Sequence, residues 1–181
     1  HIYAEQTEQL GTGHAVSSAK DVLHKEHKII LVLSGDQPLI SKETIESVIS
    51  KHIEKKSKIT IAALHVPDFK NWRIGINHFA RIIRYQNQNI IKMVEYKDAS
   101  DKEKEIKEVN PAVYAFDSNW LWQNIDKIKN KNSKGEYYLT DIIKIAFEQK
   151  EKIESISMQN ILEGLQPNTK EELEILEKLI I

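Results

Sequence analysis

Five consecutive apolar residues at positions 29–33 constrain the fold more than any other stretch of this sequence. Because the run does not alternate between apolar and polar positions, it predicts a strand covered on both faces, as in a parallel α/β sheet. The run ends at Ser34-Gly35-Asp36. Ligands bind at the carboxyl ends of strands in open α/β sheets, and a carboxylate at that edge can hold a divalent cation. A turn that merely contains an aspartate is the alternative interpretation.

The length and composition of the chain exclude several classes of protein. The 181 residues fit one domain with a sizeable core, and a net charge of −1 without basic blocks argues against nucleic-acid binding. No apolar run approaches the roughly 18 residues that span a bilayer, and the lack of cysteine excludes disulfides and thiolate chemistry. We therefore expect a cytoplasmic protein that binds neither nucleic acid nor membrane. Because the sequence begins at His1 rather than methionine, we also expect a piece of a longer chain.

The spacing of apolar residues predicts alternating helices and strands along the first half of the chain. A Gly-Thr-Gly turn at 11–13 opens a predicted helix, and its backbone N–H groups suit a phosphate or a base edge; a flexible helix entry is the alternative. Ser41 is the predicted N-cap of a second helix that ends near residue 56. Residues 58–66 form a second buried strand, so this order predicts a mainly parallel sheet with helices on its faces.

The second half of the chain adds a different pattern. Runs at 81–84 and 90–96 predict a β-hairpin, 97–107 a charged helical segment, and 113–116 a return to the sheet. Ser118 is the predicted N-cap of the next helix, a further helix follows Asp141, and 153–158 form the last strand. Thr169 and Glu172 have the spacing of a capping box, which predicts a final helix over 169–181. We expect a single domain over 1–181 with three α/β layers.

Four stretches in fixed order are more specific than any of them alone. They are QTEQLGTGHA at 6–15, SGDQPLI at 34–40, VEYKDA at 94–99 and GEYYLTD at 135–141. Together they resemble the pyrophosphorylase domain of bacterial N-acetylglucosamine-1-phosphate uridylyltransferases, which are sugar nucleotidyltransferases. The likeness runs from Gln6 to the last helix. It implies a three-layer, Rossmann-like nucleotide-diphospho-sugar transferase fold with a mainly parallel sheet and a small β-hairpin excursion.

The resemblance also implies an activity and a set of site residues. The family joins UTP to N-acetylglucosamine 1-phosphate with Mg²⁺, which gives pyrophosphate and UDP-N-acetylglucosamine for peptidoglycan precursor synthesis in cell-wall biogenesis. The residues that match family positions are Gln6, Gly11, Thr12, Ser34 and Gly35 for the nucleotide, Ala80, Glu95 and Asn110 for the sugar, and Asp36 and Asn168 for the metal. One carboxylate and one amide are enough protein ligands for Mg²⁺, because this ion takes most of its ligands from phosphate and water. Phosphoryl transfer needs no protein nucleophile, so we assign no residue of this chain as catalytic.

Several departures from the family pattern leave alternatives open. The family's glycine-rich loop, arginine and lysine, which hold the triphosphate, lie before the start of this sequence, so we expect the first strands to be missing and the fragment alone to be inactive. Phe79-Ala80-Arg81 replaces Tyr-Gly-Arg, Asn110-Pro111-Ala112 replaces Asn-Thr-Gly, Ser34 replaces a common tyrosine, and Gln166-Pro167 resembles an insertion before Asn168. A nucleotidyltransferase for another sugar 1-phosphate and a non-catalytic sugar-nucleotide-binding module are therefore the alternatives.

Many members of the family carry a C-terminal left-handed β-helix that transfers an acetyl group and forms a trimer. No hexapeptide repeat occurs in this sequence, so it supports neither acetyl transfer nor an oligomer. The final helix at 169–181 is the segment that we expect to lead into such a domain.

Overall fold

The central strand of the sheet, β2 (Ile59–His65), is buried at six of its seven residues. In the computed structural model, which describes residues 2–23, 27–86 and 88–180, Ile59 and Ile61 belong to one cluster of the hydrophobic core and Ala62 and Leu64 to another. Side chains of a strand alternate between its faces, so the two clusters lie on opposite sides of the sheet. The prediction of a strand covered on both faces at 58–66 is confirmed.

The described strands follow the order β1-β6-β2-β5-β3-β4, with β7 paired to β2. Their bounds are β1 (Ile29–Val32), β3 (Ala80–Arg84), β4 (Ile90–Val94), β5 (Glu108–Asn110), β6 (Tyr114–Asp117) and β7 (Ile153–Ser157). Among the described strands only β2 and β7 form a parallel pair, and all other pairings are antiparallel. The prediction of a mainly parallel sheet is therefore wrong at the level of pairing. β1 and β2 do run in the same direction, but β6 lies between them and runs the opposite way.

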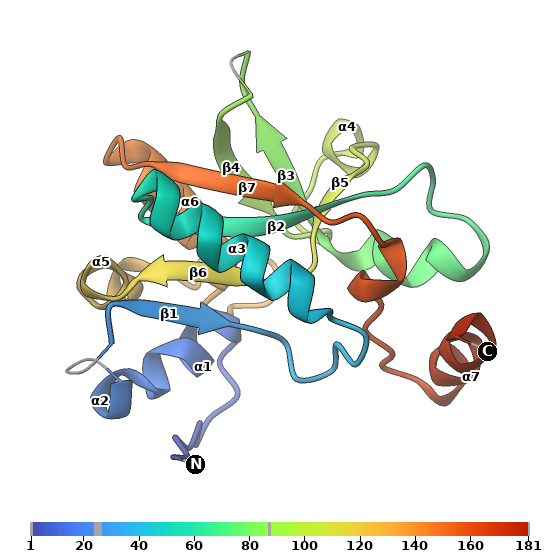
Figure 1. Ribbon diagram of the computed structural model, residues 1–181, viewed down its shortest axis with the longest axis horizontal. Helices are drawn as coiled ribbons and strands as arrows, with labels where there is room; N and C mark the ends of the chain where they lie inside the picture. Colours follow the sequence, from blue (N-terminus) through green and yellow to red (C-terminus); the bar gives the residue numbers. More distant parts are fainter. Residues whose placement is uncertain (1, 24–26, 87, 181) are drawn as a thin grey trace.

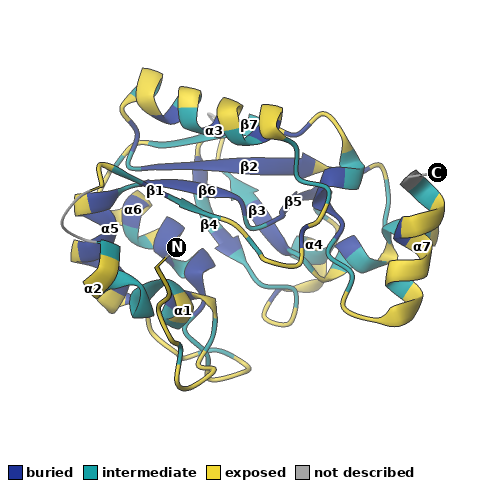
Figure 2. Ribbon diagram, turned by 60° about the horizontal axis from the view of Figure 1, so that its bottom comes forward, coloured by how far each residue is buried: buried dark blue, intermediate teal, exposed yellow. Residues whose placement is uncertain are grey.

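Helices cover both faces of this sheet and confirm the α/β class (Figure 1). Helix α3 (Lys42–Lys55) packs on one face, where Val48 joins the cluster of Ala62 and Leu64. Helices α5 (Ser118–Asn124) and α6 (Ile142–Glu148) pack on the other, where Leu121 and Ile143 join the second cluster. Figure 2 shows the resulting order of layers, with α3 on one side of the buried strands and α1, α5 and α6 on the other.

Helix boundaries confirm some local predictions and correct others. Ser41 caps α3, since its Oγ accepts a hydrogen bond from Thr44 N at 3.1 Å. Asp117, and not Ser118, caps α5, because Asp117 Oδ1 accepts from Trp120 N at 2.8 Å. The remaining α-helices are α1 (Thr12–Ser18), α2 (Lys20–Leu23), α4 (Asp101–Lys104) and α7 (Lys170–Ile180), so the predicted helix over 97–107 is only four residues long. The 3₁₀ turns are η1 (Asn71–His78), η2 (Ile125–Lys127), η3 (Leu139–Asp141) and η4 (Ile161–Gly164).

The hairpin and β1 test two further predictions. β3 and β4 form the predicted antiparallel hairpin, with Arg81 opposite Val94. β1 pairs only with β6 within the described part of the chain. Its alternate residues contact both core clusters, Ile30 and Val32 on one face and Ile29 and Leu31 on the other. The prediction of a strand covered on both faces at 29–33 is therefore confirmed for residues 29–32, whereas Leu33, just beyond β1, is 38% exposed. No helix in the described residues has the length and apolarity needed to cross a membrane.

Candidate functional site

A cleft of about 800 Å³ lies between the end of β1, the β3–β4–β5 strands and the start of α1. This volume falls in the range of small-molecule sites in proteins. All four sequence stretches contribute lining residues, although the first and last of these, Thr12 and Thr140, lie 128 positions apart. Of the predicted site residues, the cleft is lined by Thr12, Ser34, Asp36, Ala80, Glu95, Asn110 and Asn168. Gln6, Gly11 and Gly35 are not among the residues that line it.

The Gly-Thr-Gly turn is held by hydrogen bonds to the segment before η3. Gly13 N donates to Tyr137 O at 2.7 Å, and Tyr137 N donates to Leu10 O at 2.8 Å. Gly11 has a φ of 106°, and a Cβ on it would lie 2.8 Å from Tyr137 O, so a side chain does not fit there. The hydroxyl of Thr12 accepts from Leu139 N at 3.0 Å. The two glycines thus allow a close approach between two backbone segments, a role that the sequence did not reveal.

Asp36 lies in an exposed loop, and hydrogen bonds connect this loop to η4. Asp36 itself takes part in no hydrogen bond or ion pair with the described residues. Its neighbour Gln37 is buried and donates from Nε2 to Glu163 O at 2.7 Å. The carboxylate of Glu163 accepts from Ser41 N and Ser41 Oγ at 3.1 and 2.8 Å. These contacts bring the loop of Asp36 beside the segment that leads to Asn168.

Two amide side chains follow η4 at the same edge of the cleft. Gln166 donates from Nε2 to Pro111 O at 2.8 Å, and Asn168 donates from Nδ2 to Gln166 O at 3.0 Å. The predicted capping box is confirmed in one direction, since Glu172 N donates to Thr169 Oγ1 at 3.1 Å. In the other direction the Glu172 carboxylate accepts from Asn168 N rather than from Thr169 N. Sequence reasoning treated Gln166 as part of an insertion and did not identify it as a cleft residue.

The oxygen donors at this edge fit a hard divalent cation. They are the free carboxylate of Asp36 and the side-chain oxygens of Gln166 and Asn168, all three of which line the cleft. No group of three or more His, Cys, Asp or Glu side chains among the described residues could hold a metal ion by itself. This donor set suits Mg²⁺, which usually takes one or two protein oxygens and completes its shell with phosphate and water.

The opposite wall of the cleft is built around Asn110, at the end of β5. Ala80 lies directly across from it in the pairing of β3 with β5. The Asn110 side chain donates from Nδ2 to the hydroxyl of Tyr114 and accepts from Ala112 N at 3.2 Å. Burial raises the pKa of Tyr114, so its hydroxyl stays protonated at neutral pH. Ala112 has a φ of 62°, a left-handed conformation that ends the extended backbone between β5 and β6.

Glu95 follows β4 and faces a group of other carboxylates. Its Oε1 accepts from Thr140 Oγ1 at 2.9 Å. Burial raises the pKa of Glu95, and the charges of Asp141 and Asp98 act in the same direction, whereas Thr140 and Lys134 oppose them. Burial and Asp98 likewise raise the pKa of Asp141. Protons are therefore held more tightly on this side of the cleft than on free carboxylates.

Replacing Glu95 by glutamine is expected to stabilise the protein in a pH-dependent way. Because the folded-state pKa of Glu95 is raised, the wild type loses stability as the pH rises from the ordinary value of about 4.5 through that pKa. Glutamine keeps an acceptor for Thr140 but carries no charge. Urea unfolding of both proteins across this range should show a free-energy difference that grows in favour of the variant as the pH rises. Glu177→Gln, on the exposed side of α7, is the matched control. A free-energy difference between wild type and Glu95→Gln that stays constant with pH would contradict the raised pKa of Glu95.

Arg81 is a buried residue that sequence reasoning did not single out. Its side chain is fully buried at the start of β3, yet it forms no ion pair with a carboxylate among the described residues. The guanidinium lies 4.5 Å from the ring centroid of Phe69 and 5.3 Å from that of Tyr96. Its donors bond to neutral oxygens, which are Asn77 O, Asn77 Oδ1, Phe79 O and Lys104 O. Arg81 thereby holds the segment before Ala80, which forms part of the cleft wall.

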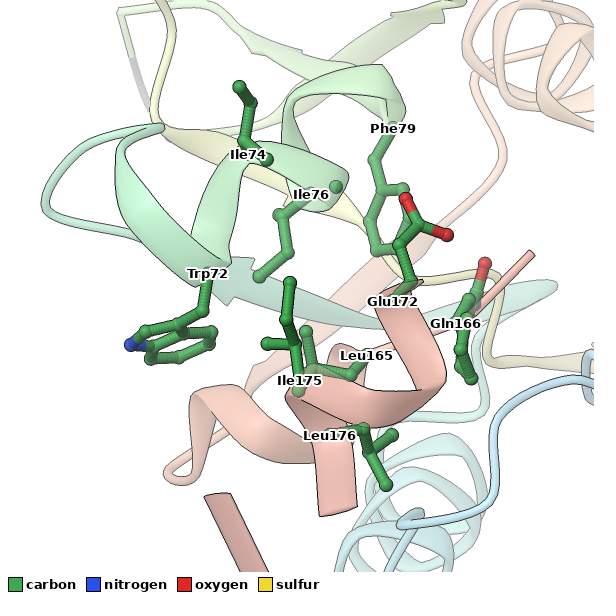
Figure 3. Close-up of a pocket in the computed structure, with 11 residues that line it drawn as sticks. Trp72, Ile74, Ile76, Phe79, Leu165, Gln166, Glu172, Ile175 and Leu176 are labelled. Atoms are coloured by element: carbon green, nitrogen blue, oxygen red, sulfur yellow. The ribbon is translucent and has the colours of Figure 1, made fainter. Parts of the chain in front are cut away.

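A second, smaller cavity lies between η1 and α7 and does not fit a nucleotide. Figure 3 shows apolar side chains facing one another across it, namely Trp72, Ile74, Ile76 and Phe79 on one side and Leu165, Ile175 and Leu176 on the other. Its volume is about 40 Å³, little more than a few water molecules occupy. Glu172 is the one charged residue among those that line it. The candidate site is the larger cleft, because residues of all four sequence stretches line it.

Comparison with known proteins shows the family to which this chain belongs. Residues 1–161 match the family model described as nucleotidyl transferase. The bifunctional protein GlmU of Bacillus licheniformis is 40% identical over 166 residues, which cover 92% of this chain and 35% of the relative. GlmU of Clostridioides difficile is 39% identical over 179 residues, which cover 99% of this chain and 37% of the relative. The chain thus spans about a third of the length of these curated relatives. Since the family model covers most of its length, this chain belongs to the nucleotidyl transferase family.

Proposed function

We propose that the cleft forms part of an active site that transfers a uridylyl group from UTP to N-acetylglucosamine 1-phosphate, giving UDP-N-acetylglucosamine and pyrophosphate. The observation that carries this proposal is the convergence of the four sequence stretches on one cleft. Sequence identity of about 40% to bacterial GlmU proteins supports the same activity. The nucleotide would lie along Thr12 and the turn at 34–36, and the sugar against the wall of Ala80 and Asn110.

The reaction requires positioning more than it requires a chemical group from the protein. A phosphate oxygen of the sugar phosphate attacks the α-phosphorus of UTP, and the bond from that phosphorus to the pyrophosphate oxygen breaks. Glu95 and Asn110 offer an acceptor and an amide to the hydroxyl and N-acetyl groups of the sugar. The hydrogen bonds that Thr140 donates to Glu95 and that Asn110 donates to Tyr114 hold both side chains in place before the substrate arrives.

Mg²⁺ held by Asp36 and Asn168, with Gln166 as a further donor, would neutralise the charge on the phosphates during transfer. The contribution of the chain is to bring these oxygens to one edge of the cleft. The hydrogen bonds from Gln37 and Ser41 to Glu163 do so, because they connect the loop of Asp36 to the segment that carries Gln166 and Asn168.

Thermal unfolding with a panel of ligands tests the proposed function. UDP-N-acetylglucosamine, UDP-glucose and UDP would each be added with and without Mg²⁺. A ligand at a hundred times its Kd stabilises the folded state by about 2.7 kcal/mol, which shifts the Tm measurably. The largest shift is expected for UDP-N-acetylglucosamine with Mg²⁺. Equal shifts for the two UDP-sugars would reject the N-acetyl specificity, and the lack of any shift would reject the nucleotide-sugar site.

A further inference from the structure

The side-chain amide of Gln6 has a fixed orientation in the structure. Its Nε2 lies 3.2 Å from Gly11 O, a carbonyl that also accepts Ala15 N at 3.0 Å. A carbonyl oxygen can only accept, so the amide nitrogen rather than the amide oxygen must face Gly11. The hydrogen bond therefore settles which end of the Gln6 amide points toward the Gly-Thr-Gly turn.

The same amide nitrogen lies 3.0 Å from Nδ1 of His14. Because the nitrogen of Gln6 donates, Nδ1 must accept, and the neutral imidazole then carries its proton on Nε2. His14 belongs to α1, is partly buried, and has its ring centroid 6.5 Å from that of Tyr137. Both amide hydrogens of Gln6 are thus engaged, one by Gly11 and one by His14. Its Oε1 accepts no hydrogen bond from the described residues.

We propose that His14 is a positioning residue that sets base specificity, because it holds the Gln6 amide with only its oxygen available to the base. The inference rests on the proposed function and adds to it that the uracil lies beside Gln6, which the family resemblance assigns to the nucleotide. Gln6 does not itself line the cleft, but it bonds to Gly11, the neighbour of the lining residue Thr12. Uracil has a donor at N3–H that pairs with this oxygen, whereas cytosine has a lone pair at N3 that the oxygen repels. Without His14, only the hydrogen bond to Gly11 still holds the amide, so the amide turns more readily and the distinction between the two bases weakens.

Three replacements of His14 separate this role from a structural one. Asparagine places an amide oxygen close to the position of Nδ1, glutamine carries its amide one bond further out toward the position of Nε2, and leucine offers no acceptor. Calorimetric titration of each variant with UDP and with CDP, both in Mg²⁺, gives the ratio of the two Kd values. The wild type is expected to bind UDP more tightly. The ratio should fall about tenfold or more in His14→Leu and His14→Gln, and His14→Asn should restore most of it.

The outcomes distinguish the inference from the proposed function. If His14→Leu and His14→Gln bind both nucleotides more weakly by the same factor, or keep the wild-type ratio, His14 does not set base specificity and the inference is wrong. If the wild type itself fails to prefer UDP over CDP, the uracil assignment of the proposed function is wrong instead. Thermal unfolding without ligand checks that each variant is folded, and His14→Gln gives the decisive comparison if His14→Leu does not fold.

Discussion

Replacing Asp36 by alanine is expected to abolish the Mg²⁺-dependent part of the stabilisation by UDP-N-acetylglucosamine. Asp36 is the one carboxylate among the three proposed metal ligands, and its side chain bonds to no described residue. The unliganded Tm should therefore stay close to that of the wild type. With ligand at a hundred times the wild-type Kd, the wild type gains about 2.7 kcal/mol and the variant should lose most of that gain.

A control at another exposed carboxylate makes this result specific. Asp101 opens α4 outside the cleft, and its side chain is fully exposed. Asp101→Ala should respond to ligand and Mg²⁺ as the wild type does. Asp36→Asn, which keeps the shape of the side chain and removes the charge, should behave like Asp36→Ala. A Mg²⁺-dependent shift that survives in both Asp36 variants would exclude Asp36 as a metal ligand.

Replacing Arg81 by methionine is expected to cost about 3 kcal/mol of folding free energy, because buried acceptors lose their donors. Asn77 O, Phe79 O and Lys104 O all accept from this guanidinium, and a methionine leaves them unpaired inside the protein. The contacts with the rings of Phe69 and Tyr96 are lost as well. Urea unfolding measures the change as a lower midpoint with an unchanged m value.

Arg73→Met is the matched control for Arg81→Met. Arg73 lies nearby in η1 and forms an ion pair with Asp68 at 2.6 Å, where the carboxylate is about a third exposed. Ion pairs near the surface contribute little, so this change should cost less than about 1 kcal/mol. If Arg81→Met costs no more than Arg73→Met, the hydrogen bonds of Arg81 do not stabilise the wall of the cleft.

Local sequence patterns predicted those elements whose character depends on their own residues. The apolar run of β2 and the Ser41 cap of α3 are such cases. The direction of neighbouring strands was not predictable in this way, because it depends on how the chain crosses the sheet. β6 lies between β1 and β2 and runs antiparallel to both, and the residue types at 114–117 do not indicate this direction. β5 was missed because its three residues, two of which are polar, are too few to show an alternation of apolar and polar positions.

The candidate site was predictable to the extent that it depends on recurring motifs. Thr12, Asp36 and Glu95 were selected from such motifs, and the structure brings all three to one cleft. Glu163 and Arg81 were missed because each acts on groups of distant segments, backbone groups above all, which side-chain identity does not report. One signal for Arg81 was present: a charged residue at the start of the apolar run that forms β3.

The most direct test of the nucleotide-sugar site is chemical-shift mapping of the backbone amides by NMR, which is practicable for a 21.0 kDa chain. UDP-N-acetylglucosamine would be titrated into the labelled protein in the presence of Mg²⁺. The expected result is a set of shifts at Gly11, Thr12, Gly35, Asp36, Ala80, Glu95 and Asn110, on both walls of the cleft. Shifts confined to the small cavity between η1 and α7, or no saturable shifts at all, would contradict the proposed site.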